Sequence, residues 1–224
     1  MADEERRPPG TSEEDPLLGS AGDASQQEGK PLYYNLIIVW GSVFSHDLML
    51  FSAHPLLNSA AVLFFIQGIL ILQPTHTAKQ KKHGTLTHAA LNDIALLAAI
   101  AGLVIIEYNK IKDGNPHFES PHAILGILTY IMVLLQAIVG VTQYFTPGLY
   151  GGEEKAKALY KYHRVWGYVT LVVMLATLCA ATQTTFGEKY LEMQLWAVVT
   201  ASVIVLVGVV PRVRLSKFGW IAGK

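Results

Sequence analysis

Six apolar segments separated by short polar loops constrain this chain more than any other feature of its sequence. The first covers residues 32–44, and five longer ones follow at about 51–72, 88–106, 122–145, 163–182 and 191–210. Each of the five is close to the roughly 20 residues that a helix needs to cross a bilayer. An all-α fold, a six-helix transmembrane bundle, is therefore predicted.

Composition agrees with a membrane protein. Hydrophobic residues make up 51% of the 224 residues and charged residues only 15%, against roughly 25% charged residues in soluble domains. The mean hydropathy is +0.34. The single cysteine, Cys179, excludes an intramolecular disulfide. The lipid bilayer is the expected partner, and no nucleic-acid partner is expected.

The first apolar segment is the shortest. Its 13 residues reach roughly 20 Å at about 1.5 Å per residue, whereas the hydrocarbon core is about 30 Å thick. Extension through Ser45, or tilting with local thinning of the bilayer, would be needed for it to cross. If it crosses, both termini lie on the same side of the membrane.

Residues 1–30 form a region of different character. They carry eight acidic residues against three basic ones and almost no apolar bulk, so we expect a disordered tail, cytosolic if the first segment spans. Within it, Glu13–Leu18 resembles the acidic dileucine sorting signals of vacuolar and lysosomal proteins. The alternative is two leucines in a flexible tail. The expected transmembrane domain covers 31–211, and 212–224 form a basic cytosolic tail.

Basic residues predict the orientation. They gather in the loops after the second and fourth segments and in the C-terminal tail: Lys79, Lys81, Lys82, Lys155, Lys157, Lys161, Arg212, Arg214, Lys217 and Lys224. All three regions lie on one side of the predicted bundle, and the positive-inside rule makes that side cytosolic.

Four of the eight histidines stand where an apolar segment begins: His54, His88, His122 and His163. Consecutive helices of an up-and-down bundle run antiparallel, so these starts alternate between the two membrane faces. His54 and His122 are expected near the non-cytosolic face, and His88 and His163 near the cytosolic face. Two facing imidazoles from different helices are what axial ligation of a haem iron requires, so each pair is a candidate haem site.

A histidine at the end of an apolar helix does not by itself indicate a cofactor. A hydrogen bond at the helix end explains a single one as well, but four in an alternating arrangement favour a cofactor. A zinc site needs three or four converging ligands, whereas the two pairs are predicted on opposite sides of the bilayer. The remaining four histidines are predicted to lie in loops: His46, His76, His83 and His117.

Short motifs surround the four candidate ligands. They are Phe51–Pro55, Thr87–His88, Phe118–His122, Leu159–His163 and Gly167–Tyr168. With them the chain resembles the eukaryotic cytochrome b561 family, nearer to its small membrane-only members, over about residues 32–210. The resemblance implies that four central helices hold two b-type haems (haem b), with His54 opposite His122 and His88 opposite His163 as axial ligands of the iron.

The resemblance also implies an activity. Electrons would cross the membrane from cytosolic ascorbate to monodehydroascorbate or a ferric chelate on the other side, which makes the protein a transmembrane ascorbate-dependent oxidoreductase. An anionic donor needs a basic patch, for which the candidates are Lys81, Lys82, Lys157 and Lys161. These lysines are explained as well by their role in fixing the topology.

Two departures from the family pattern bear on the substrate. The arginine-containing motif that ascorbate-dependent members carry after the second span is absent, and the chain there has Leu70–Pro74. Lys110 stands where these members have a histidine upstream of the third ligand, although a lysine would still serve an anion. A quinol or another reductant is therefore an alternative donor.

A haem-free membrane scaffold or sorting protein is the alternative from another functional class. Many members of the family are dimers, so a homodimer is a further candidate assembly. A vacuolar, lysosomal or other endomembrane location follows only if the dileucine motif acts as a signal.

Overall fold

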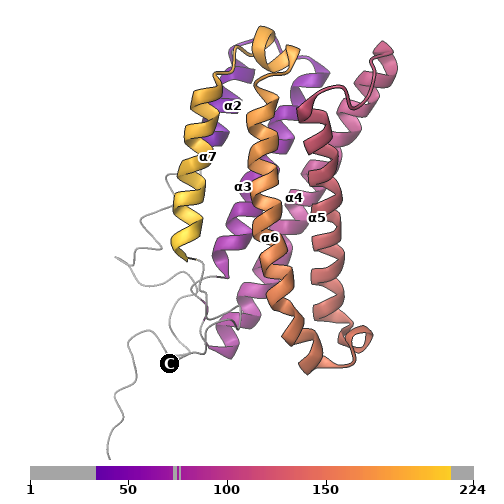
Figure 1. Ribbon diagram of the computed structural model, residues 1–224, viewed down its shortest axis with the longest axis vertical. Helices are drawn as coiled ribbons and strands as arrows, with labels where there is room; N and C mark the ends of the chain where they lie inside the picture. The colour runs from indigo at the N-terminus through magenta and orange to yellow at the C-terminus, as the bar shows by residue number, and fades with distance from the viewer. Residues whose placement is uncertain (1–33, 73–74, 76, 213–224) are drawn as a thin grey trace, which may run out of the picture.

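The computed structural model describes residues 34–72, 75 and 77–212, and all regular secondary structure in this part of the chain is helical, with no strand (Figure 1). The six α-helices are α2 (Tyr34–Phe44), α3 (Ala53–Ile71), α4 (Ala78–Asp113), α5 (Pro121–Phe145), α6 (Glu153–Ala181) and α7 (Leu195–Val209). Short helical turns flank them: η2 (Leu50–Ser52), η3 (Pro147–Tyr150), η4 (Phe186–Tyr190) and η5 (Val210–Arg212). The predicted N-terminal tail, its dileucine motif and residues 213–224 lie outside the described residues.

The helices form an up-and-down bundle. Their connections alternate between its two ends, and α2 and α7 lie together at one edge (Figure 1). The most extensive packing is between α3 and α4 and between α5 and α6, so the centre consists of two antiparallel hairpins. Its core is apolar, with Ile66, Ala95, Leu171 and Val205 all buried.

Four helical segments have membrane length and apolar composition: Leu50–Ile71, Ala78–Asp113, Pro121–Phe145 and Glu153–Ala181. The protein is thus a multi-pass integral membrane protein. The prediction that the last apolar segment forms a helix over about 191–210 was wrong at its start, because α7 has 15 residues and begins only at Leu195. Before it, Glu192 adopts a positive φ of 49°, which interrupts the helix. The first helix, α2, has 11 residues.

Two helices are longer than their apolar segments. The side chain of Thr77 accepts a hydrogen bond from the Gln80 amide, and that of Gln80 accepts one from the Thr77 amide, so α4 begins well before His88. In α6, Glu153 and Glu154 occupy the first turn, where negative charge interacts favourably with the helix dipole and stabilises the helix. The lysine-bearing regions predicted as loops are therefore helical.

These lysines define the ends of the bundle. We call the end where α4 and α6 begin the basic end; it carries Lys79, Lys81, Lys82, Lys155, Lys157 and Lys161. The other end, where α3 and α5 begin, is called the opposite end. His83 also lies within α4, so its placement in a loop was wrong.

Candidate functional site

The structure brings the four histidines together as two pairs. The imidazole rings of His54 and His122 have centroids 6.2 Å apart and planes at 89°. Those of His88 and His163 are 6.4 Å apart, with planes at 83°. In each pair one ring comes from the α3–α4 hairpin and the other from the α5–α6 hairpin, so both sites lie between the hairpins, one toward each end of the bundle.

The two pairs differ in depth along their helices. His54 and His122 are each the second residue of their helix, as the sequence predicts. His88 and His163 are each the eleventh, because α4 and α6 begin with polar turns at the basic end. The prediction that all four stand at helix starts was therefore wrong for the basic-end pair.

Main-chain carbonyl groups hold three of the four rings. The Nδ1 atom lies 2.9 Å from the Gly102 oxygen in His54, 2.7 Å from the Gly68 oxygen in His88 and 3.0 Å from the Thr177 oxygen in His122. Each bond joins the two helices of one hairpin. A carbonyl oxygen can only accept, so the Nδ1 atom carries the hydrogen in all three rings.

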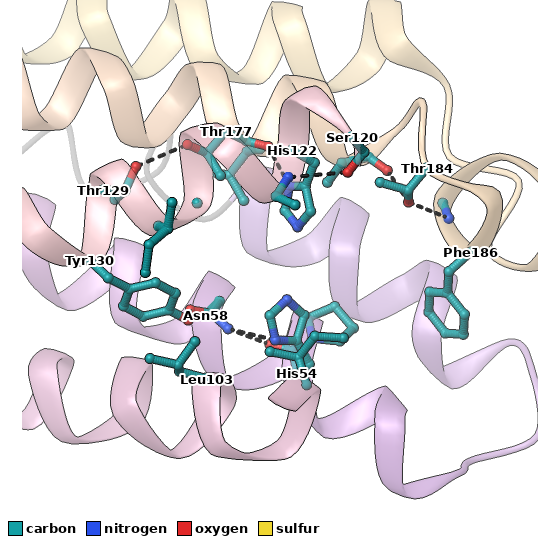
Figure 2. Close-up of a pocket in the computed structure, with 18 of the residues that line it drawn as sticks. His54, Asn58, Leu103, Ser120, His122, Thr129, Tyr130, Thr177, Thr184 and Phe186 are labelled. Carbon is teal, nitrogen blue, oxygen red and sulfur yellow. Dashed lines mark hydrogen bonds between the residues drawn. The ribbon is translucent and has the colours of Figure 1, made fainter. Parts of the chain in front are cut away.

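This tautomer leaves the Nε2 lone pair of each ring free. In Figure 2 the second ring nitrogens of His54 and His122 point toward each other across the space between α3 and α5. A histidine that binds a metal through one nitrogen commonly donates its other N–H to a carbonyl or carboxylate. The three rings therefore have the hydrogen bonding of metal ligands.

His163 is held differently. The side-chain amide of Gln136 lies 2.8 Å from its Nδ1 atom and 3.1 Å from its main-chain oxygen. The other amide atom lies 3.3 Å from the Gly167 nitrogen, from which the amide oxygen accepts a hydrogen bond. His163 also packs against bare backbone, since a Cβ atom at Gly140 would lie only 3.1 Å from its Cε1 atom.

An internal repeat underlies the α3–α4 hairpin. Each helix carries a histidine, an asparagine one turn later and a glycine farther along, at identical spacings: His54, Asn58 and Gly68 in α3, and His88, Asn92 and Gly102 in α4. Each histidine bonds to the glycine of the other helix. This repeat was not predicted from the sequence, although the shared spacing was a signal that could have revealed it.

The repeated asparagines pack against the repeated glycines. A Cβ atom at Gly102 would collide with the Asn58 amide nitrogen, and one at Gly68 would lie 2.5 Å from that of Asn92. Each asparagine amide donates to the main-chain oxygen of its own histidine. Only glycine therefore allows the two helices to approach closely enough for the histidine–carbonyl bonds.

The opposite-end pair has additional polar contacts. The Tyr130 hydroxyl donates to the Asn58 side-chain oxygen at 2.7 Å, and the hydroxyls of Thr129 and Thr177 lie 3.0 Å apart across α5 and α6. In Figure 2 these groups lie together on one side of the two rings. The position in α6 that corresponds to Tyr130 in α5, counted from the histidine of each helix, is the buried Leu171.

A cavity of about 940 Å³ opens beside this pair. Its inner wall includes His54, His122 and Tyr130, and Phe51 and Phe186 pack edge-to-face nearby, with their ring centroids 4.4 Å apart. The lining also includes residues of the loop after α4. A mainly apolar cavity with a few polar groups is typical of a cofactor or ligand site.

These features fit a metal-containing cofactor whose metal is bound by two imidazoles. Two metal–nitrogen bonds of about 2 Å each, together with the distance from each nitrogen to its ring centre, account for centroid separations of the observed size. Within the described part of the chain, no three or more His, Cys, Asp or Glu side chains converge to hold a bare metal ion. The donor set suits a cofactor that supplies the equatorial ligands itself.

The five candidate substrate lysines do not form one group. Lys81 and Lys82 are exposed on the first turns of α4, and on α6 Lys157 pairs with Glu153 at 2.6 Å while Lys161 lies over the Tyr162 ring. Lys110 lies at the opposite end, where its ammonium donates to the Pro116 carbonyl and its side chain lines the cavity.

Two of the remaining histidines lie near the opposite end. The Nδ1 atom of His117 is 3.3 Å from a Glu107 carboxylate oxygen, and both residues line the outer cavity. His46 has its Nδ1 atom 2.8 Å from the Ser42 main-chain oxygen and lies beside the Tyr190 ring. His76 lies outside the described residues.

Comparison with known proteins identifies the family. No curated protein matches the chain. Residues 46–187 match the family model for eukaryotic cytochrome b561, and this range includes α3 to α6 and all four paired histidines. Because the match covers more than half of the 224 residues, the chain belongs to the eukaryotic cytochrome b561 family.

Proposed function

We propose that this protein carries electrons across a membrane from cytosolic ascorbate to monodehydroascorbate or a ferric chelate. Family membership implies transmembrane electron transfer through haems and a reductase activity. The proposal adds the ligands, the direction, the donor and the acceptor. His54 and His122 hold one b-type haem at the opposite end, and His88 and His163 hold the other toward the basic end.

The observation that carries this proposal is the ring geometry of the two pairs. Rings from different hairpins face each other at 6.2 and 6.4 Å, and three of the four donate through Nδ1 to a carbonyl of the neighbouring helix. The neutral Nε2 atoms are thereby directed into the space between the hairpins before any ligand binds. Such preorganisation lowers the entropic cost of binding.

The protein holds the cofactors and excludes water from the interior of the bundle. When bound, haem would supply a one-electron carrier, and the two histidines of each pair would hold it, which suits outer-sphere electron transfer. One histidine pair lies toward each end of the bundle, which supports electron transfer from one side of the membrane to the other through two haems. Ile66, Ala95 and Leu171 belong to one buried apolar cluster, which excludes water from the interior of the bundle.

The basic end is proposed to face the cytosol and to receive the donor. Its lysines satisfy the positive-inside rule, and exposed side chains such as Lys81 and Lys82 attract an anion such as ascorbate. At the opposite end, Lys110 and His117 at the cavity wall offer positive or polar groups to an anionic acceptor.

Reduction in proteoliposomes tests the donor and the cofactor together. Purified protein should show a dithionite-reducible b-type spectrum with about two haems per chain, and stopped-flow mixing with ascorbate on the basic-end side should reduce the haem at that end first. Reduction by a quinol but not by ascorbate would exclude ascorbate as the donor while retaining the haems. A colourless protein after haem-supplemented expression would contradict the proposed function and favour a scaffold or sorting role.

A further inference from the structure

We propose that Gln136 is a positioning residue for His163, and that its side-chain amide sets the hydrogen bonding of this ligand and the redox potential of the basic-end haem. The inference rests on the proposed function, in which His163 binds that haem. It concerns one residue of α5 that neither the sequence motifs nor the family match singles out.

Gln136 occupies a repeated position with an unusual partner. Each ring is held by a residue of the neighbouring helix, and that residue always lies at the same spacing after the histidine of its own helix. The four cases are Gly102 after His88, Gly68 after His54, Thr177 after His163 and Gln136 after His122. The first three offer their main-chain oxygen. At the fourth, the side-chain amide of Gln136 lies 2.8 Å from the His163 Nδ1 atom.

An amide differs from a carbonyl because it can donate or accept. With its nitrogen toward His163, Gln136 donates to the His163 main-chain oxygen and to Nδ1, while its oxygen accepts from the Gly167 amide. The ring hydrogen is then on Nε2, and that atom has no lone pair for a metal. With the amide turned over, its oxygen accepts from Nδ1–H and Nε2 is free to bind, but the same oxygen then faces the His163 main-chain oxygen and the amide nitrogen faces the Gly167 N–H.

Ligation of a haem by His163 therefore selects the second orientation of the amide. The three carbonyl-held rings need no such change, because their partners can only accept. An acceptor on the far side of a metal-bound imidazole raises the basicity of the ligand, and loss of such a partner typically weakens metal binding by roughly 10–100-fold. Gln136 can thus adjust one haem without affecting the other.

Two substitutions in the full-length, haem-loaded protein test this role. Gln136→Glu keeps the side-chain length and presents a stronger acceptor to Nδ1–H, so one midpoint potential should become more negative. Gln136→Leu removes the acceptor, so the same potential should become more positive, and this haem should bind roughly 10–100-fold more weakly. Spectroelectrochemical titration measures the potentials, and transfer of haem to apomyoglobin measures the affinity.

The matched control is Thr200→Val. Thr200 is exposed on α7, outside the four helices that carry the paired histidines, and its hydroxyl donates only to the Trp196 main-chain oxygen of its own helix. This variant should leave both potentials at their wild-type values. Wild-type potentials and haem affinities in both Gln136 variants, or equal shifts of the two haems, would overturn the role of Gln136. A wild-type protein without two haems would instead contradict the proposed function.

Discussion

The two ends of the bundle hold their histidine pairs at nearly the same ring separation but in different surroundings. At the opposite end, His54 and His122 stand in the first turns of their helices beside a cavity of about 940 Å³. At the basic end, His88 and His163 lie beyond several turns of helix that carry the lysines. The ring geometry is nearly the same in the two pairs although their surroundings differ. This indicates that the packing of the two hairpins fixes the positions of the histidines, whereas the helix ends determine how accessible each pair is.

The largest expected effect comes from removing a single ligand. His54→Ala should disturb one haem and spare the other, and ascorbate should still reduce the remaining haem from the basic end. His88→Ala should instead remove rapid reduction by ascorbate, because it disturbs the haem nearest the donor. Haem content and stopped-flow absorbance measure both effects, and loss of both haems or neither in His54→Ala would contradict the comparison.

Adding a side chain at the close contact between α3 and α4 should affect the two ends separately. Gly102→Ala places a Cβ atom against Asn58 beside His54, and Gly68→Ala does the same against Asn92 beside His88. Each should reduce the occupancy of its own site and destabilise the fold by about 1–3 kcal/mol, the usual cost of overpacking. Thermal unfolding and haem content measure this, with Gly208→Ala as a control, because a Cβ atom there meets nothing within 4 Å. If either variant lost haem equally from both sites, the assignment of one glycine to each histidine would be wrong.

A smaller effect should separate the ends through Tyr130. Tyr130→Phe removes the hydroxyl that donates to Asn58. It does not change the basic end, where the buried Leu171 takes the corresponding position. The cost should be about 1 kcal/mol of stability, the net contribution of a typical hydrogen bond. Redox titration should show a shift of the opposite-end haem alone. A shift of the basic-end haem would mean that Tyr130 does not belong to one site.

The smallest expected effect concerns the surface lysines. Replacing Lys81 and Lys82 by glutamine should slow reduction by ascorbate a few-fold at low ionic strength, because the local positive potential falls. The difference should disappear at high salt, where exposed charges are screened over about a Debye length. Replacing Lys110 at the other end should leave this rate unchanged, and an equal reduction in rate would show that the donor does not distinguish the ends.

Much of this organisation could be predicted from the sequence. Apolar segments of membrane length predict helices, and the alternation of their directions correctly places His54 beside His122 and His88 beside His163. Basic residues near helix starts were misassigned to loops because charge alone does not distinguish a loop from a polar helical turn. The capping box of Thr77 and Gln80 was the signal that α4 begins earlier.

The missing parts of the prediction concern contacts between hairpin partners. The His–Asn–Gly spacing shared by α3 and α4 marks Gly68 and Gly102 as a repeat, but a main-chain oxygen such as that of Thr177 has no sequence signature as a hydrogen-bond acceptor, so its bond to a ring could not be predicted. The role of Gln136 depends on which atom of a flexible side chain approaches Nδ1, and only three-dimensional packing determines this. The shortness of α7 depends on the backbone conformation at Glu192.

The pairing of ligands across the hairpins is the central claim, and haem content in two double variants tests it most directly. His54→Ala with His122→Ala removes both ligands of one site, so the protein should keep about one haem per chain. His54→Ala with His88→Ala removes one ligand from each site, so both haems should be lost or bound weakly. The same haem content in both double variants, or the reverse order, would contradict the account.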